Sequence, residues 1–234
     1  MHSMYKRHFS LYNSCMNEKL HNYNRLLVEK NQTTNLTAHK TEEQSFKYNI
    51  QDSLLFNKTI SDYLNKFKPT AKVADIGSGG GCPAIPLKIS FPEINLTMLD
   101  SVRKKTDFLS EVITKLALHD TIAIHTRIED FCLVSRESFD IVTARAVAPL
   151  NTLLEYALPL LKVGGIFFAF KGKNADEEIA LSKRSLTALG GTVIETISTD
   201  LDSEITRTLI VIKKTSKTPT QYPRAKNLPR TRPL

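Results

Sequence analysis

A run of glycines follows directly after a short apolar segment and carries the clearest chemical signal in the chain. It reads DIGSGGGCP from Asp75, with glycine at four of the five positions from 77 to 81. Because glycine lacks a Cβ, such a loop turns tightly and lets its backbone approach a ligand closely. A helix that begins at Pro83 would add free N–H groups for a polar or anionic part of that ligand. Asp100 ends the next apolar segment, 23 residues after Gly77, where an acid accepts hydrogen bonds from ribose hydroxyls.

Two cofactors suit a glycine loop that is followed by a ribose-binding acid. Dinucleotide-binding loops follow G-x-G-x-x-G, but Cys82 occupies the position of the third glycine. The pattern from Asp75 to Gly81 is D-x-G-x-G-x-G, which resembles the S-adenosylmethionine (AdoMet) loop of Rossmann-like methyltransferases. The resemblance predicts AdoMet contacts at Gly77, Gly79 and Asp100. A purely structural turn is the alternative, although four glycines are an entropically costly way to build one.

The elements around this loop alternate between strand and helix. Strands are expected at 72–76, 94–99, 121–125, 139–143, 166–170, 192–197 and 207–212, and helices after Pro83 and at 103–118, 150–161 and 175–189. This order predicts an α/β domain, residues 71–213, with a seven-stranded, doubly wound and mostly parallel sheet. In such sheets ligands bind beyond the carboxyl ends of the strands, which is where the glycine loop and Asp100 fall.

Two appendages flank this domain. Residues 1–70 have apolar positions at helical spacing in two stretches, 9–27 and 42–67, the second ended by Pro69, so they predict an N-terminal helical extension. Residues 214–234 form a basic tail that is rich in proline, for which we expect no regular element. Residues 213–234 hold seven basic and no acidic side chains, whereas residues 71–212 are slightly acidic. This asymmetry indicates a polyanionic partner, the alternative being a tail that its charge merely keeps in solution.

Composition excludes several classes of protein. A hydrophobic fraction of 41% supports a packed core, and no segment approaches the roughly 18 apolar residues of a membrane span. The first residues lack the apolar core of a signal peptide. Three cysteines, at positions 15, 82 and 132, have no zinc-binding spacing. We therefore expect a cytoplasmic monomer with no metal site and no membrane association.

Motifs along nearly the whole chain resemble the RsmG family, also called glucose-inhibited division protein B. They are NLTA from Asn35, DSL from Asp52, DIGSGGGCPAIPLKISFP from Asp75, LDSVRKKTDFL from Leu99, RIE from Arg127, TARAVA from Thr143, KG from Lys171 and YPR from Tyr222. The resemblance implies a class I AdoMet-dependent methyltransferase that methylates N7 of a guanine in 16S rRNA. Its expected partner is 16S rRNA or the 30S ribosomal subunit.

The resemblance also implies positions for the site. AdoMet contacts map by position to Gly77, Cys82, Asp100, Ile128, Glu129 and Arg145. The family usually has Phe or Leu in place of Cys82, Gly or Ser in place of Ala84, and Ala in place of Ile128. The change at Ile128 adds bulk next to the adenine, but a backbone contact there would survive. Glu129 could instead be an ordinary acid in the first turn of a helix.

Arg145 is the one candidate catalytic residue, because it follows the fourth strand at the ligand-binding edge of the sheet. It could contact the cofactor, an RNA phosphate or the guanine, or it could be an ordinary ion pair. Candidate RNA-binding residues are Lys171, at the end of the fifth strand, and Arg224, Lys226, Arg230 and Arg232 in the tail. The match of the tail to the family pattern implies that it binds the substrate or docks against the domain. For Lys171 a solvated strand end is the alternative.

Missing motifs narrow the reaction. The loop after the fourth strand reads ARAVAPL, not the Asn/Asp-Pro-Pro-aromatic loop of enzymes that methylate adenine at its exocyclic nitrogen. Methylation of cytosine at C5 needs a cysteine nucleophile, and neither Cys82 nor Cys132 is well placed. Guanine N7 has an exposed lone pair and no proton, so direct in-line transfer needs alignment rather than a base. Two rivals remain: a small-molecule or protein methyltransferase with an incidental tail, and an RNA-binding module without a cofactor.

Overall fold

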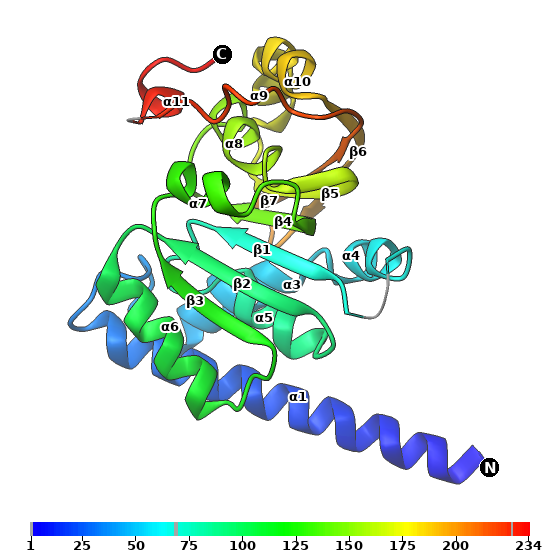
Figure 1. Ribbon diagram of the computed structural model, residues 1–234. Helices are drawn as coiled ribbons and strands as arrows, with labels where there is room; N and C mark the ends of the chain where they lie inside the picture. The colour runs from blue at the N-terminus through cyan, green and yellow to red at the C-terminus, as the bar shows by residue number, and fades with distance from the viewer. Residues whose placement is uncertain (1, 68–69, 226) are drawn as a thin grey trace.

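The computed structural model describes residues 2–67, 70–225 and 227–234, with side chains from residue 15 onward (Figure 1). The expectations for Pro69 and Lys226 lie outside the described residues. The centre of the fold is a seven-stranded sheet in the order β3-β2-β1-β4-β5-β7-β6. The strands are β1 (Lys72–Ile76), β2 (Asn95–Asp100), β3 (Thr121–His125), β4 (Phe139–Arg145), β5 (Leu161–Lys171), β6 (Gly191–Asp200) and β7 (Thr206–Lys214).

Strand direction follows the expected pattern. Strands β1 to β5 run parallel, while β7 lies antiparallel to both β5 and β6. The chain winds from β1 to β3 on one side and then returns to place β4 beside β1. The carboxyl ends of β1 and β4 therefore flank the switch point, where ligands bind in such sheets. The predicted α/β architecture, with a doubly wound and mostly parallel sheet, is confirmed.

Helices cover both faces of the sheet (Figure 1). One face carries α1 (His2–Asn31), α5 (Ala84–Ser90) and α6 (Arg103–Lys115). The other carries α7 (Ile128–Val134), α8 (Leu150–Ala157), α9 (Ala175–Leu181) and α10 (Lys183–Leu189). The predicted helix at 150–161 ends earlier, at Ala157, and the one at 175–189 is divided at Ser182, whose hydroxyl bonds the Glu178 carbonyl oxygen at 2.6 Å.

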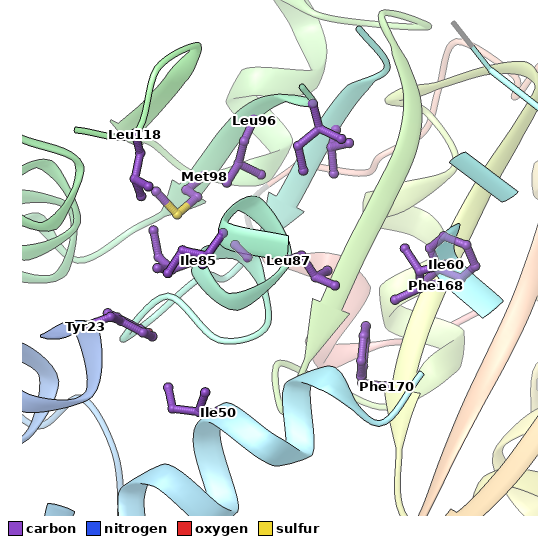
Figure 2. Packing of buried hydrophobic residues seen from close by; sticks show 14 of the residues in the cluster. Tyr23, Ile50, Ile60, Ile85, Leu87, Leu96, Met98, Leu118, Phe168 and Phe170 are labelled. Atoms are coloured by element: carbon purple, nitrogen blue, oxygen red, sulfur yellow. The ribbon is translucent and has the colours of Figure 1, made fainter. Parts of the chain in front are cut away.

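Two apolar cores lie on the two faces of the sheet, because successive side chains of a strand point to opposite faces. Phe168 and Phe170 of β5 belong to the core shared with α1, α5 and α6, whereas Phe167 belongs to the core shared with α8. Figure 2 shows Tyr23 and Ile50 in the first of these cores, close to the central sheet. The N-terminal helical extension therefore packs into the same core as the sheet.

The second half of that extension is more irregular than the helical spacing predicts. It consists of α2 (Glu42–Ser45), the π-helix η1 (Phe46–Gln51), α3 (Asp52–Leu54) and α4 (Asn57–Leu64). Thr41 caps α2 by accepting a hydrogen bond from the Gln44 amide at 3.2 Å. Single π-helical turns often occur at functional sites, and this one holds the polar side chain of Asn49 inside the protein.

The tail contradicts the expectation of no regular element. Residues Leu228–Thr231 form the short helix α11, with Pro229 in its first turn, where a missing N–H leaves no hydrogen bond unmade. The helix packs beside α8, as Figure 1 shows. In the part of the chain that the structure describes, no helix is long and apolar enough to cross a membrane. The same residues contain no cluster of His, Cys, Asp and Glu that could hold a metal ion.

Candidate functional site

A pocket of about 320 Å³ opens beyond the carboxyl ends of the strands next to the switch point. Its described lining residues are Gly77, Leu99, Asp100, Ser101, Val102, Lys105, Thr126, Arg127, Ile128, Glu129, Ala146, Val147, Tyr156, Asn227 and Arg230. Four of the residues predicted to bind the cofactor therefore share one pocket. We call it the cofactor pocket.

The glycine loop needs its glycines at two positions in particular. Gly77 and Gly81 have φ values of +68° and +99°, which L side chains rarely adopt. A Cβ on Gly77 would lie 2.6 Å from Cγ2 of Val147, and one on Gly81 would lie 2.8 Å from the side chain of Ile85. A side chain at Gly77 would therefore clash with Val147, and one at Gly81 would clash with α5.

Asp100 holds this loop in place. Its Oδ2 accepts a hydrogen bond from the Gly79 amide at 2.8 Å, and its Oδ1 accepts one from the Val102 amide at 2.9 Å. Gly79 is thus tied to Asp100 but is not among the described lining residues. Since each carboxylate oxygen has more than one lone pair, Asp100 keeps acceptor capacity for a ligand in the pocket.

Cys82 lies away from the pocket, on the side of the loop that faces α1. Its Sγ is 3.1 Å from the hydroxyl oxygen of Tyr23, and that hydroxyl also donates to the Gly80 carbonyl oxygen at 2.6 Å. Burial raises the pKa of the Cys82 thiol, which keeps it protonated. The contact that the resemblance places at Cys82 stays a prediction, and the side chain packs instead against the N-terminal extension.

Asp75 lies beneath the glycine loop and is almost completely buried. Its Oδ1 accepts a hydrogen bond from the Thr143 hydroxyl at 2.6 Å, which joins β1 to β4. Its Oδ2 has no hydrogen-bond partner among the described residues. Burial raises the pKa of Asp75 from 3.8 to about 6, because desolvation disfavours the charged form.

This raised pKa gives a testable dependence of stability on pH. The folded state binds the Asp75 proton more tightly than the unfolded chain does, so the stabilising contribution is full below about pH 4 and is lost as pH rises through about 6. The free energy of unfolding is compared between the wild type and Asp75→Asn at each pH. Between about pH 5 and about pH 8, the wild type should lose about 1 kcal/mol more than the variant. Urea unfolding of both proteins at the two pH values measures the difference. A difference that stays constant would contradict the raised pKa.

A second pocket, of about 350 Å³, adjoins the first and shares Ala146 with it. Its described lining residues are Asp52, Phe56, Arg145, Ala146, Phe170, Lys171, Gly172, Glu178 and Arg207. They come from α3 and the residue before α4, from the carboxyl ends of β4 and β5, from α9 and from the start of β7. We call it the acceptor pocket.

Arg145 lies in the wall of the acceptor pocket and is 17% exposed. Its Nη1 lies 3.2 Å from Oδ2 of Asp52 and 3.3 Å from the Ser53 hydroxyl, while Asp52 Oδ1 accepts from Nε of Arg207 at 2.8 Å. The ion-pair alternative for Arg145 is therefore present, but inside the protein and shared with Arg207. A contact between Arg145 and the cofactor stays a prediction.

Asp52 and Arg207 were missing from the predicted site. The DSL motif that contains Asp52 was part of the family resemblance, yet nothing in the sequence indicated a partner 93 residues away. The described wall of the acceptor pocket combines two guanidinium groups and the Lys171 ammonium group with two carboxylates, so it carries a net positive charge.

Lys171 is not a solvated strand end, since its side chain is only 9% exposed. Its Nζ lies 2.6 Å from Oε2 of Glu178 and 2.9 Å from the carbonyl oxygen of Ala148. The same Glu178 oxygen accepts from the Leu150 amide at 2.7 Å. Lys171 therefore joins the end of β5 to α9 and to the loop after β4.

The tail is docked on the domain, which is one of the two uses expected for it. Glu155 of α8 is fully buried, and its carboxylate accepts hydrogen bonds from Nε of Arg224 at 2.9 Å, from Nη2 at 2.7 Å and from the Arg224 amide at 2.7 Å. A buried carboxylate requires such compensation, and this is the physical reason for the docking. Arg230 and Arg232 are both exposed, and of these two only Arg230 is among the described lining residues of the cofactor pocket.

Solved structures with the same architecture include several methyltransferases. An rRNA methylase from Streptococcus thermophilus matches with a TM-score of 0.52 at 17% identity, covering 68% of this chain and 95% of that chain. The geranyl diphosphate C-methyltransferase from Streptomyces coelicolor A3(2), in complex with S-adenosyl-L-homocysteine, matches with a TM-score of 0.52 at 13% identity, covering 68% and 74%. These likenesses show the fold, which is that of the Rossmann-like class I methyltransferases.

Sequence comparison is more specific. The family model for GidB, rRNA small subunit methyltransferase G, matches residues 16–206. The ribosomal RNA small subunit methyltransferase G of Thermoanaerobacter sp. (strain X514) is 44% identical over 220 residues, which are 93% of this chain and 90% of that protein. The chain belongs to the rRNA small subunit methyltransferase G family, and it is a methyltransferase of rRNA.

Proposed function

We propose that the chain transfers a methyl group from AdoMet to N7 of a guanine in 16S rRNA, directly and in line, without a covalent enzyme intermediate. The observation that carries this proposal is the pair of pockets that meet at Ala146. One has a glycine loop with a carboxylate beside it, and the other has a basic and aromatic wall. Two adjoining pockets of this kind bring a methyl donor and a base together, which makes alignment the main task of the protein.

The cofactor pocket fits AdoMet in its chemistry. The glycine loop offers backbone where no Cβ has room, and Asp100 keeps acceptor capacity for ribose hydroxyls. Ile128 and Glu129 lie in the same pocket, where the family pattern has its adenine contacts. Bound AdoMet supplies an electrophilic methyl group on a positively charged sulfur. The S-adenosyl-L-homocysteine in the Streptomyces coelicolor enzyme, the same molecule without that methyl group, supports the proposal.

The acceptor pocket fits a guanine. The rings of Phe56 and Phe170 meet edge to face, with centroids 6.0 Å apart, and both line the pocket as an apolar wall for a base. Arg145 and Arg207 supply donors for guanine O6, the acceptor next to N7 on the same edge. A base held through O6 would keep the lone pair of N7 free to attack the methyl group.

Proton removal has no place in this reaction, since N7 carries a lone pair and no hydrogen. The two acidic residues that line the acceptor pocket are both ion-paired: Asp52 with Arg145 and Arg207, and Glu178 with Lys171. The described wall of the acceptor pocket therefore carries positive charge, and both of its carboxylates are ion-paired. We infer that Asp52 and Glu178 position the basic side chains rather than act as bases.

We infer that the substrate is 16S rRNA, free or in the 30S ribosomal subunit, which places the protein in the cytoplasm. Since Arg224 is engaged with Glu155, phosphate contacts fall to exposed basic residues around the pockets, such as Arg127. Affinity for RNA from such contacts should fall with rising salt.

The test uses methyl-labelled AdoMet and ribosomal particles from cells that lack the modification. Incubation with 30S subunits and with free 16S rRNA should place label in the RNA, whereas 50S subunits should stay unlabelled. Label recovered in ribosomal protein, or in a small molecule from a cell extract, would favour the rival class of methyltransferase. Binding to RNA without any affinity for AdoMet would favour the non-enzymatic module.

A further inference from the structure

The C-terminal tail supplies two residues of the cofactor pocket. Asn227 and Arg230 line this pocket together with residues of the glycine loop, the second strand end and α8. They reach it from a segment that follows the last strand of the sheet, and Figure 1 shows that segment crossing the outside of α8. The tail is thus a part of the pocket as well as a surface appendage.

Several contacts hold this segment in place before and after the pocket. Before it, the guanidinium of Arg136 donates to the carbonyl oxygens of Thr218, Pro219 and Tyr222 at 2.6–2.8 Å, and Arg224 pairs with the buried Glu155. After it, the Ser185 hydroxyl donates to the carbonyl oxygen of Leu234 at 3.3 Å. Asn227 and Arg230 are therefore held between two anchors.

Arg230 connects the tail to the loop that divides the two pockets. Its Nη2 donates to the carbonyl oxygen of Val147 at 2.6 Å. The Val147 side chain lies against Gly77, where a Cβ would come within 2.6 Å of it. Arg230 therefore fixes the residue that faces the first glycine of the loop.

Arg230 shares the cofactor pocket with Tyr156 and Glu129. Burial and the neighbouring Glu129 raise the pKa of Tyr156 to about 12, while the positive charge of Arg230 acts in the lowering direction. The guanidinium of Arg230 thus adds positive charge to a pocket wall that also carries the Glu129 carboxylate.

We propose that the C-terminal tail forms the outer wall of the cofactor pocket, with Asn227 contacting the adenosine part of AdoMet and Arg230 positioning Val147 against the bound cofactor. An amide side chain suits this role because it offers a donor and an acceptor to the edge of an adenine. The inference rests on the proposed function, since it takes AdoMet as the ligand. It gives the tail a use in cofactor binding that its basic composition alone did not indicate.

Calorimetric titration of the full-length chain with AdoMet and with S-adenosyl-L-homocysteine tests this role. Arg230→Ala and Asn227→Ala should each raise the Kd about tenfold, the effect of losing a hydrogen bond to a positioned group. Arg230→Lys, which can still donate to the Val147 carbonyl oxygen, should recover part of the loss. The matched control is Arg232→Ala, which removes the same charge from an exposed position of the same tail and should stay within about twofold.

Kinetics with 30S subunits give a second measurement that a general loss of structure would not reproduce. Arg230→Ala should raise the KM for AdoMet and leave kcat unchanged at saturating AdoMet. Unchanged Kd values in both pocket variants, or an equal loss in Arg232→Ala, would overturn the inference and leave the proposed function standing. A wild-type chain that bound neither AdoMet nor S-adenosyl-L-homocysteine would refute the proposed function and this inference together.

Discussion

Replacing Arg224 by alanine is expected to lower the free energy of unfolding by about 3–5 kcal/mol, the cost of leaving a buried charge without its partner. Glu155 is fully buried on α8, and Arg224 donates to it from Nε, from Nη2 and from its own amide. The alanine variant removes the side-chain donors and leaves the carboxylate in an apolar environment. Urea unfolding at neutral pH measures the effect.

The control for this prediction is Arg232→Ala, which lowers the charge of the tail equally but leaves Glu155 paired. A second variant isolates the cause: in Arg224→Ala with Glu155→Gln, no charge is buried, so part of the lost stability should return. If the free energy of unfolding of Arg224→Ala lies within about 1 kcal/mol of the wild-type value, Arg224 does not compensate the charge of Glu155, and the tail is not docked as described.

Replacing Gly77 by valine is expected to reduce AdoMet affinity by more than about 100-fold, a cost of about 3 kcal/mol. The backbone of Gly77 has a φ of +68°, and its Cβ would lie 2.6 Å from Cγ2 of Val147. A β-branched residue is strained in that conformation, and relief would push the glycine loop or Val147 into the cofactor pocket. Calorimetry with AdoMet measures the loss, and circular dichroism reports whether the variant is folded.

Three further variants make this prediction specific. Gly172→Ala adds a Cβ that meets nothing within 4 Å and should leave AdoMet affinity unchanged. Gly77→Ala should lose less affinity for AdoMet than Gly77→Val. Adding Val147→Ala to Gly77→Ala should restore part of that affinity, because the clash is removed while the backbone strain remains. Wild-type affinity in Gly77→Val would show that this loop does not hold the cofactor.

The sequence could predict what depends on local pattern. The strands were identifiable from short apolar runs, and the glycine loop with Asp100 from residue type and spacing, because both are short-range properties. The acceptor pocket was only partly predictable. Arg145 stood out beside the fourth strand, but its partner Asp52 and the second guanidinium, Arg207, come from elements that the fold alone brings together.

The composition of the tail predicted the kind of partner, since rRNA is a polyanion, but not how each basic residue is used. Seven basic residues without an acid indicated a polyanionic partner, yet Arg224 binds an acid within the same chain. Glu155 was the available signal, since it lies in the otherwise apolar stretch LLEYALPLL from Leu153, where a carboxylate requires a partner. The π-helix at Phe46–Gln51 had no such signal, because it depends on the polar network around Asn49 that tertiary contacts complete.

Nucleoside analysis of the methylated RNA tests the central claim most directly. The 30S subunits from cells lacking the modification are incubated with the protein and methyl-labelled AdoMet, and the 16S rRNA is then digested to nucleosides and separated by mass. The proposed function predicts that the label appears in 7-methylguanosine, at about one methyl group per 16S rRNA. Cleavage of the labelled RNA at 7-methylguanosine should then occur at a single position. Label in another methylated nucleoside, or none in the RNA while AdoMet binds, would contradict it.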